Sequence, residues 1–539
     1  MHNAKGKFFQ QMAENHLTIN EEYWNSFSLQ ESDFEYIFNY LIEEEIPKSS
    51  FELLKTIIEH RIETEIVSLE KRHSESGTIY TPQQKFKIGE KIILPQFGWA
   101  EAEIINIRPG INPDFPPFEV IEIESDDAGT ISLASGIDDH LLNQAPLYDS
   151  KDTNFQPDFV LNKYKKQLLD KFELTLRDRD DLVQIAGRWF PRALLIEINS
   201  GYLNLAEAIL DMESGGPLKT KAILEQLDLP SNENPRLIEF SLNFALQEDE
   251  RFDEVGPSGE ILWFLKRLEP DAVKNLPALL RDQSDDYNHD LVIPLLEQVS
   301  NQVYDELEEY EPEFQGENSF SISIIYPHWK VGTLPLTKRI SNLFPTAHEA
   351  PRVRFTFVDV QQNKKFPGWV VRPQKIVYGL KEWYESRELI PGCIVNVKRG
   401  DNAGEVEVWV EKRKSSHDWI RTAIIGADGG IVFATTKQLA PYEYHDQMVI
   451  AVSGGDVLDN IWTEEKKFRQ PLETTITSMM KELGKLNPQG HVHAQELYAA
   501  VNLVKRCPPG AVLTILESSR HITHIGDQYY RLKDTSQEE

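Results

Sequence analysis

Apolar residues recur every three or four positions on both sides of Pro47, near the start of the chain. The two sets are Phe34, Ile37, Phe38 and Leu41, then Leu53, Leu54, Ile57 and Ile58. Ser32-Asp33-Phe34-Glu35 and Ser49-Ser50-Phe51-Glu52 fit the capping-box pattern of helix starts. We therefore expect a helical hairpin region over 1–80 that packs against a neighbour.

From Phe86 to about Leu133 the apolar period changes to two. Short apolar segments at 91–94, 102–105 and 119–123 are separated by turn residues. This close spacing predicts a small SH3-like β-barrel over 85–145. Because the stretch is acidic, we favour a role as a spacer or in protein contact.

Helical and strand patterns alternate again over 190–270. Leu203–Leu210 presents one apolar helical face, a short helix follows, and Asn234-Pro235 supplies the cap and first-turn proline of a third helix. Two strands, 251–256 and 261–265, then flank a Pro-Ser-Gly turn. Three helices closed by a two-stranded wing is the element order of a winged helix.

The same order recurs over 472–535. Helices are expected at Thr475–Leu483, Ala494–Lys505 and Pro508–Ser518, followed by a hairpin at 521–532. In both places the hairpin consists of a strand ending in glycine, a turn and an aromatic return strand. This internal similarity predicts a second, C-terminal winged helix.

A linker and a larger β-domain are expected between the two winged helices. The linker, 271–317, is interpreted as helical and acidic, with a solvated run at Asp305, Glu306, Glu308, Glu309, Glu311 and Glu313. Six alternating segments between 320 and 410, and a helix-compatible stretch at Leu380–Arg387, predict a closed or nearly closed barrel over 318–455 with a trailing hairpin. The expected fold class is multidomain α+β.

The bulk composition supports folded domains. The chain has 539 residues, 40% of them hydrophobic, and a formal net charge of −31. Two cysteines, Cys393 and Cys507, are too few for a disulfide framework, which suits a reducing cytosol. The first fifteen residues lack the apolar core of a signal peptide, and no run approaches the length needed to cross a bilayer. We expect a cytoplasmic protein that does not associate with a membrane.

The sign of the charge reverses between Lys330 and Arg421. This segment holds 17 Lys and Arg against 10 Asp and Glu, so its charge is 17 − 10 = +7 within a chain of −31. Aromatic residues, among them Trp369 and Trp383, are interleaved with these cations. Such a pattern is typical of a module that binds a polyanion. The alternative is a solvated domain whose positive charge serves no ligand.

Three segments of this basic block carry a resemblance. Gly368-Trp369-Val370-Val371-Arg372, Tyr378–Glu385 and Leu389–Val397 resemble the DNA-binding pseudobarrel of plant transcription factors and some restriction enzymes, over about 318–415. Cys393 stands where that family usually has an acidic residue. Trp369 and Trp383 are expected in the barrel core.

The resemblance implies two loops that grip the major groove of duplex DNA like the jaws of a wrench. The corresponding loops are Gln361–Phe366 and Arg372–Lys375. The candidate nucleic-acid-binding residues are Arg352, Arg354, Lys364, Lys365, Arg372, Gln374, Lys375, Lys398 and Arg399. The alternative is that Lys364 and Lys365 only cap a surface hairpin.

The two winged helices resemble the module of the bacterial RNA polymerase delta subunit and related chromatin-linked proteins, which implies a transcription-associated role. Acidic residues around the third helix of the first unit, such as Glu239 and Glu248, favour protein contact over DNA binding. The whole chain is similar to uncharacterised bacterial proteins of the same domain order, a resemblance that implies no function.

Motifs for catalysis are weak. No P-loop, nucleophile elbow or HExxH motif occurs. His491, His493 and Glu496 lie close in sequence, but no distant further ligand is evident, so capping and surface roles are favoured over a metal. Glu464 and Lys466 supply only half of a nuclease motif. We expect no enzyme activity, cofactor, metal or small-molecule substrate.

These patterns favour a non-enzymatic nucleic-acid-binding or transcription-associated adaptor. The basic pseudobarrel would hold DNA, and the acidic winged helices would hold a protein, for example one of the transcription machinery. The alternative is a protein-interaction scaffold in a bacterial defence or stress assembly, without nucleic-acid binding. The sequence determines neither the oligomeric state nor the identity of the partner.

Overall fold

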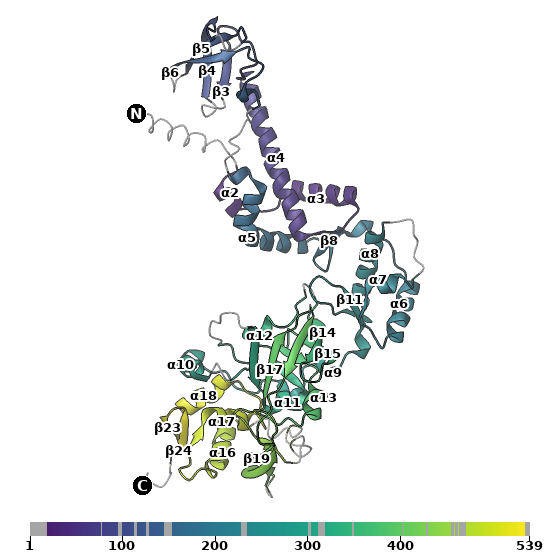
Figure 1. Cartoon of the computed structure of the whole chain (residues 1–539), viewed down its shortest axis with the longest axis vertical. Coiled ribbons are helices and arrows are strands. Elements are labelled where there is room, and N and C mark those ends of the chain that lie inside the picture. The colour runs from purple at the N-terminus through teal and green to yellow at the C-terminus, as the bar shows by residue number, and fades with distance from the viewer. Residues whose placement is uncertain are drawn as a thin grey trace. The chain divides into compact units, whose positions relative to one another are not determined.

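The computed structural model of this mixed α+β protein describes residues 19–533 (Figure 1). The gaps in this description are 77, 95–99, 113–115, 126–128, 145–152, 228–233, 300–302, 311–317, 348–349, 403, 427–428, 454–457, 459–461 and 463–469. The described residues fall into two compact units. One lies within 1–196 and includes 232–240, and the other lies within 197–231 and 241–539. None of the described helices is both long and apolar enough to span a bilayer.

Helices and a small sheet build the core of the first unit. The helices are α2 (Glu21–Asn25), α3 (Glu31–Glu44), α4 (Ser50–Ser76) and α5 (Pro157–Arg177), and the strands are β1 (Lys48–Ser49), β7 (Leu182–Ile185) and β8 (Arg188–Pro191). The expected hairpin, α3 and α4, is present, although 1–18 lie outside the described residues. Its first cap differs from the prediction, because α3 begins at Glu31 and Asp33 bonds the Gln30 amide at 2.7 Å. The second cap, Ser49 with Glu52, is confirmed.

A five-stranded sheet follows α4 in the chain. Its strands are β2 (Thr78–Ile79), β3 (Lys91–Leu94), β4 (Ala100–Pro109), β5 (Glu119–Ser125) and β6 (Gly129–Ser135), in the order β2-β3-β4-β5-β6. The amide of Gly136 donates to the Gln84 carbonyl, which links the segment after β2 to the end of β6. Alternate residues such as Ile92, Ile104 and Ile121 fill its interior. The turn expected at Gly98 lies outside the described residues.

One element order occurs three times along the chain: helix, strand, helix, helix, strand, strand. In the first unit the elements are α3, β1, α4, α5, β7 and β8, which we call the first module. Its sheet order is β1-β8-β7, so the last strand lies in the centre. The prediction missed this module because the small five-stranded sheet is inserted between its second and third helices.

The second module lies where the first winged helix is expected. Its elements are α6 (Ser200–Met212), β9 (Leu218–Lys219), α7 (Thr220–Leu224), α8 (Pro235–Glu248), β10 (Phe252–Glu254) and β11 (Leu262–Leu265). Trp263 is fully buried among Ala206, Leu210 and Leu242. The Asn234 side chain accepts from the Arg236 amide at 3.0 Å, as expected for the cap of α8.

The third module occupies the expected C-terminal position. Its elements are α16 (Leu472–Gly484), β22 (Val492–His493), α17 (Ala494–Val501), α18 (Pro509–Ser518), β23 (Ile522–Gly526) and β24 (Tyr529–Leu532). The sheet orders β10-β11-β9 and β22-β24-β23 repeat the central position of the last strand. The three modules therefore share one strand topology.

A seven-stranded sheet lies between the second and third modules in the chain. Its strands are β12 (Ser319–Ser323), β13 (Thr333–Pro335), β14 (Arg352–Asp359), β15 (Lys364–Val371), β16 (Ile376–Tyr378), β17 (Ile394–Arg399) and β18 (Glu405–Trp409). The six expected strands and the expected helix, α13 (Lys381–Ser386), are all present. The order β12-β17-β18-β14-β15-β16-β13 leaves β12 and β13 as edges, so the curled sheet is a half-barrel and not the closed or nearly closed barrel expected. Trp383 is buried in its core, as predicted, whereas Trp369 is buried on the other face of the sheet, in a cluster with Val255 and Phe264.

The sheet domain is followed by the expected hairpin. Its strands β19 (His417–Ile425) and β20 (Ile431–Leu439) pair over their full length, and β21 (Ala451–Val452) adds to β19 in parallel. Ile420 on the inner face is buried with Ala440, Val449 and Ala451. This inner face holds the hairpin to the rest of the unit.

The segment expected to be a solvated acidic linker is folded. It contains α9 (Asp271–Lys274) and α10 (His289–Val299), and Asp305, Glu306 and Glu308 are buried. The prediction of a solvated spacer is therefore wrong for these three carboxylates. Arg506 forms ion pairs with two of them, Asp305 and Glu306. It lies about 200 residues further along the chain, so no local sequence pattern could reveal the pairing.

Candidate functional site

The nine predicted nucleic-acid contacts are distributed over two opposite ends of the half-barrel. Strands β14 and β15 are antiparallel, with Arg352 opposite Val371 and Asp359 opposite Lys364. At about 3.3 Å per residue, the eight residues of β15 separate Lys364 from Arg372 by about 25 Å. The structure therefore does not bring the two expected wrench loops together. We call the end with Arg352 the module end and the end with Lys364 the lysine end.

At the module end, two arginines bind the chain's own second module. Arg352 forms ion pairs with Asp253 at 3.0 Å and with the buried Glu269 at 2.6 Å. Arg354 donates to the Gly216 carbonyl at 3.2 Å, and its guanidinium lies 5.2 Å from the centre of the Phe264 ring. Burial lowers the pKa of Arg354. Neither side chain is free to meet a phosphate.

The turn after β15 lies at the same end. Arg372 donates to the Pro345 carbonyl at 3.0 Å, and burial lowers its pKa. Gln374 is half-buried, whereas Lys375 is exposed in the left-handed backbone region at φ 52. Of these three candidate residues, the structure leaves only Lys375 open to solvent.

The remaining candidates are mostly paired as well. Lys365 forms an ion pair with Glu405, and Lys398 lies 3.5 Å from Glu407. Arg399 donates to the Asn342 carbonyl. Lys364 is exposed and has no ion pair among the described residues. The positive charge of the basic block is thus largely neutralised or held by its own chain.

Three further lysines at the lysine end were not among the predicted contacts: Lys412, Lys414 and Lys437. All three are exposed, and none forms an ion pair within the part of the chain that the structure describes. In the turn before Lys364, the Val360 amide donates to the Val408 carbonyl, and the Gln361 side chain donates to the Val410 carbonyl. The end of β18, which leads to Lys412, therefore lies at the lysine end. The amide of Arg413 donates to the Pro441 carbonyl, which extends the β19–β20 ribbon past these lysines. We include Lys364, Lys412, Lys414 and Lys437 in the lysine end.

A sequence signal for this site exists but is short. All three residues of Lys412-Arg413-Lys414 are basic. Arg413 binds Asp418, and the lysines on either side of it have no ion pair among the described residues. Only the register, which sets Trp419 opposite Lys437, shows that the returning strand adds a third free cation. The basic tripeptide can therefore be recognised in the sequence, whereas the contribution of Lys437 cannot.

The third helices of the second and third modules do not present free basic surfaces. The first turns of α8 belong to the first unit, where the ring of Phe240 lies 6.0 Å from that of Phe190. Helix α18 contains no basic residue, and α10 packs against it through residues such as Leu296 and Val299. A helix covered in this way cannot enter a DNA groove.

The charge of the third module differs from the prediction. The expected acidic character holds for 200–266, with 13 acidic and 5 basic residues, but 472–535 has 6 acidic and 7 basic residues. For this module it is the burial of α18, and not repulsion from phosphate, that argues against DNA binding.

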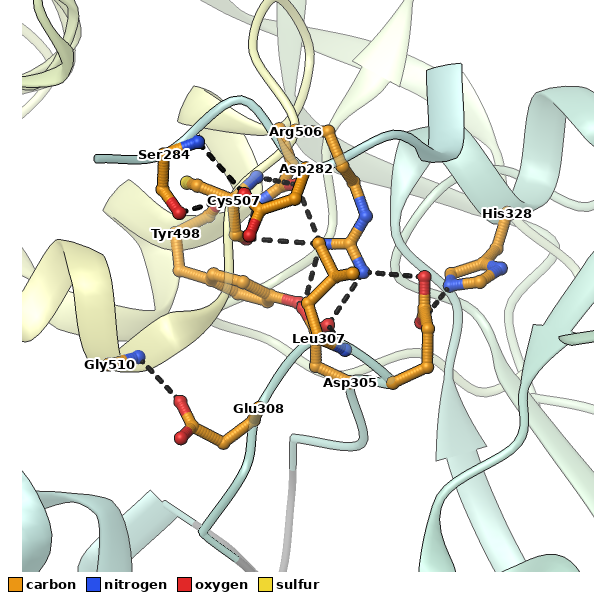
Figure 2. Close-up of polar contacts among 12 residues, drawn as sticks. Asp282, Ser284, Asp305, Leu307, Glu308, His328, Tyr498, Arg506, Cys507 and Gly510 are labelled. Atoms are coloured by element: carbon orange, nitrogen blue, oxygen red, sulfur yellow. Dashed lines mark hydrogen bonds and ion pairs between the residues drawn. The ribbon is translucent and has the colours of Figure 1, made fainter. Parts of the chain in front are cut away.

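A buried network of charged side chains joins the former linker to the third module (Figure 2). Both terminal nitrogens of the Arg506 guanidinium, Nη1 and Nη2, donate to Asp305, at 2.8 and 2.6 Å, and Nη2 also donates to Glu306 at 2.9 Å. Tyr498 donates to the same Asp305 carboxylate. The Arg506 and Asp305 side chains are completely buried. We call these residues, with His328, the Arg506 network.

His328 extends the network into the sheet domain. Its Nε2 lies 2.8 Å from Glu306 and its Nδ1 lies 2.8 Å from the Thr333 hydroxyl. Burial alone would raise the pKa of Glu306, but Arg506 and His328 hold it well below its ordinary value. The network therefore connects three segments that are distant in sequence, and its ionised carboxylates depend on their cationic partners.

A third carboxylate of the same run, Glu308, caps helix α18. Glu308 accepts from the Gly510 amide at 2.9 Å. A Cβ atom on residue 510 would lie 2.7 Å from this carboxylate oxygen, so the close approach requires glycine. Negative charge at a helix N-terminus is favourable. Glu308 thus fixes the position of α18 under the former linker.

Two of the residues considered as metal ligands, His493 and Glu496, have structural roles. Glu496 forms an ion pair with Arg421 at 2.5 Å, and His493 accepts from the Gln495 amide at 3.2 Å as the cap of α17. Burial, and after it the electrostatic effect of His445 and Arg421, lowers the pKa of His493 to about 4. The described residues contain no group of three or more His, Cys, Asp or Glu that could hold a metal ion.

No family model, curated protein or solved structure matches the chain. Function therefore has to be inferred from the geometry of the lysine end, of the modules and of the Arg506 network.

Proposed function

We propose that this protein is a non-enzymatic nucleic-acid-binding adaptor in which the lysine end contacts the phosphate backbone. The observation that carries the proposal is that Lys364, Lys412, Lys414 and Lys437 are exposed and have no ion pair in the described part of the chain. A cation without a carboxylate partner can neutralise a phosphate and release a counterion. The arginines at the module end cannot, because they are already bound.

In this proposal the three modules are winged helices that serve protein contact. Their common strand topology and terminal hairpins support the winged-helix assignment. The small five-stranded sheet inserted in the first module is an SH3-like spacer. The resemblance of the second and third modules to the RNA polymerase delta subunit favours a transcription-associated protein as partner.

The experiment measures binding of the full chain to labelled oligonucleotides, duplex and single-stranded, over a salt series. We expect affinity that falls as salt rises. The triple variant Lys412→Ala, Lys414→Ala, Lys437→Ala should bind more weakly and lower the salt slope by about two, since each lost phosphate contact removes roughly 0.7–0.9. Absence of binding at low salt, or affinity that does not depend on salt, would refute the proposal.

Lys375→Ala is the matched control. This lysine is equally exposed but lies at the opposite end of β15. We expect its replacement to leave both affinity and salt slope unchanged. An effect as large as that of the triple variant would mean that charge anywhere on the surface suffices, and that the lysine end is not a site.

A protein-interaction scaffold is the second candidate. It is favoured by the acidic charge of 200–266 and by two exposed apolar residues on α6, Leu205 and Met212, which are 53% and 77% exposed. Pull-down from a nuclease-treated lysate tests it with the double variant Leu205→Glu, Met212→Glu. Partners that survive nuclease and are lost with this variant, in the absence of oligonucleotide binding, would put the scaffold first.

A further inference from the structure

One tryptophan of the β19–β20 ribbon lies on the surface opposite the unpaired Lys437. Trp419 is 68% exposed, and it is the one exposed tryptophan among those that the structure describes. The register places it directly opposite Lys437, and His417 opposite Leu439. Because residues that face one another in a ladder project to the same side, these four side chains share one face of the ribbon.

The exposure of Trp419 is not required by packing. The neighbouring Ile420 projects to the other face and is 1% exposed, in a cluster with Ala440, Val449 and Ala451. That cluster anchors the ribbon without any contribution from the indole. A large aromatic side chain is therefore presented to solvent on a strand whose fold does not depend on it.

The charges around Trp419 select the kind of ligand. Arg413 is bound to Asp418 at 2.8 Å, and Arg421 is bound to Glu496. Asp418 itself also accepts from the Tyr444 hydroxyl at 2.7 Å. Glu411 accepts from the Trp409 indole at 2.8 Å. The carboxylates of Asp418, Glu496 and Glu411 are thus engaged, and the cations without an ion pair among the described residues are Lys412, Lys414 and Lys437.

An exposed aromatic face between free cations matches the chemistry of an unstacked nucleotide strand. The bases of a single strand can stack on an indole while their phosphates meet lysines. In a duplex the base faces are already stacked on one another, and only their edges are open in the grooves. An acidic peptide would satisfy the lysines but would leave the indole without a stacking partner.

We propose that the face of the β19–β20 ribbon around Trp419 binds single-stranded nucleic acid. One base stacks on the Trp419 indole, and Lys412, Lys414 and Lys437 contact the flanking phosphates. This inference rests on the proposed function and adds its ligand class, a single strand in preference to a duplex. It also adds a contact that is not electrostatic.

The test uses the full chain, fluorescence anisotropy, and three labelled probes: a 12-nucleotide oligo-dT, the oligo-rU of the same length, and a 12-base-pair duplex. We expect the oligo-dT or the oligo-rU to bind at least tenfold more tightly than the duplex, and the two single-stranded probes show whether DNA or RNA is preferred. Trp419→Ala should weaken single-strand binding about 5- to 150-fold, as expected for the loss of one stacked base. Trp419→Phe should retain most of the affinity.

The salt series separates the two kinds of contact. Trp419→Ala should leave the salt slope unchanged, because stacking releases no phosphate counterion, whereas the triple lysine variant should lower it. Thermal denaturation checks that Trp419→Ala is folded, as its exposure predicts. Leu439→Ala, on the same face and 38% exposed, is the control for loss of apolar surface and should change affinity less than twofold.

The outcomes distinguish this inference from the proposed function. Absence of binding to all three probes refutes both. Duplex binding as tight as single-strand binding, or an unchanged affinity in Trp419→Ala, overturns the inference and leaves the proposed function standing. Competition by a 12-residue polyglutamate as strong as that by unlabelled oligo-dT would overturn it in favour of an acidic protein ligand.

Discussion

The Arg506 network and the lysine end show two opposite uses of charge within one compact unit. In the network, Asp305 and Glu306 surround Arg506, and all three side chains are at most 2% exposed. At the lysine end, Lys412, Lys414 and Lys437 are exposed and no described carboxylate pairs with them. The charges of the first region are satisfied inside the chain, and those of the second are not.

This difference reverses what the charge runs suggest when they are considered alone. The acidic run appeared to be solvent-facing, yet two of its carboxylates, Asp305 and Glu306, are buried beside Arg506. The basic block was expected to bind a ligand along its length, yet Arg352 and Arg354 are taken up by the second module. The sign of a segment's net charge therefore does not decide its role, because that role depends on where the partners of its charged side chains lie in the fold.

The largest expected effect comes from breaking the network. Arg506→Ala leaves Asp305 and Glu306 buried without a guanidinium, which should destabilise the third module by about 3–5 kcal/mol. Hydrogen exchange of the α17 and α18 amides measures the loss locally. Arg520→Ala, at an exposed arginine, is the control and should change the free energy of unfolding by less than about 0.5 kcal/mol.

A neutral replacement sharpens this result. The triple variant Arg506→Met, Asp305→Asn, Glu306→Gln removes the guanidinium and both carboxylates together, so none of these three groups is left as a buried charge without its partner. It should recover much of the stability lost in Arg506→Ala. If it is as unstable as the single variant, the loss comes from packing or hydrogen bonding and not from an uncompensated charge.

A smaller effect is expected from pH. The pKa of Glu306 is lower in the folded chain than its ordinary value of 4.5, because Arg506 and His328 outweigh the effect of burial. Its contribution to stability is therefore complete above about pH 4.5 and is lost as pH falls towards the folded-state pKa. Urea unfolding between pH 3 and 6 should show this decline, and Glu306→Gln should flatten it.

The exposed Glu473 supplies the comparison for the pH experiment. Glu473→Gln should leave the acid dependence as it is in the wild type. Equal flattening by both substitutions would show that the decline reflects the general repulsion of a positively charged chain and not the Arg506 network.

The smallest effect on stability is expected at the lysine end. Lys412→Ala, Lys414→Ala and Lys437→Ala should each change the free energy of unfolding by less than about 0.5 kcal/mol, because exposed side chains without partners hold nothing in place. Thermal denaturation of the three single variants measures this. A loss above about 1 kcal/mol in any of them would reveal a structural contact and remove that lysine from the proposed site.

Local patterns in the sequence determined most of the secondary structure. The alternation of Val353, Phe355 and Phe357 sufficed to place β14, and the Asn234-Pro235 pair sufficed to place the start of α8. The burial of Trp369 and Trp383 also followed from their positions in apolar segments. These features depend on neighbours within a few residues, so the chain alone reveals them.

Only the tertiary structure decided which charges are free. Arg506 lies 200 residues from Glu306, and Arg352 lies 83 residues from Glu269, so neither pairing leaves a local trace. The same holds for the first module, whose helices α4 and α5 are separated by the inserted sheet. An ion's partner is set by the folded path of the whole chain, because electrostatic pairing acts over a few ångströms in space and is indifferent to distance along the sequence.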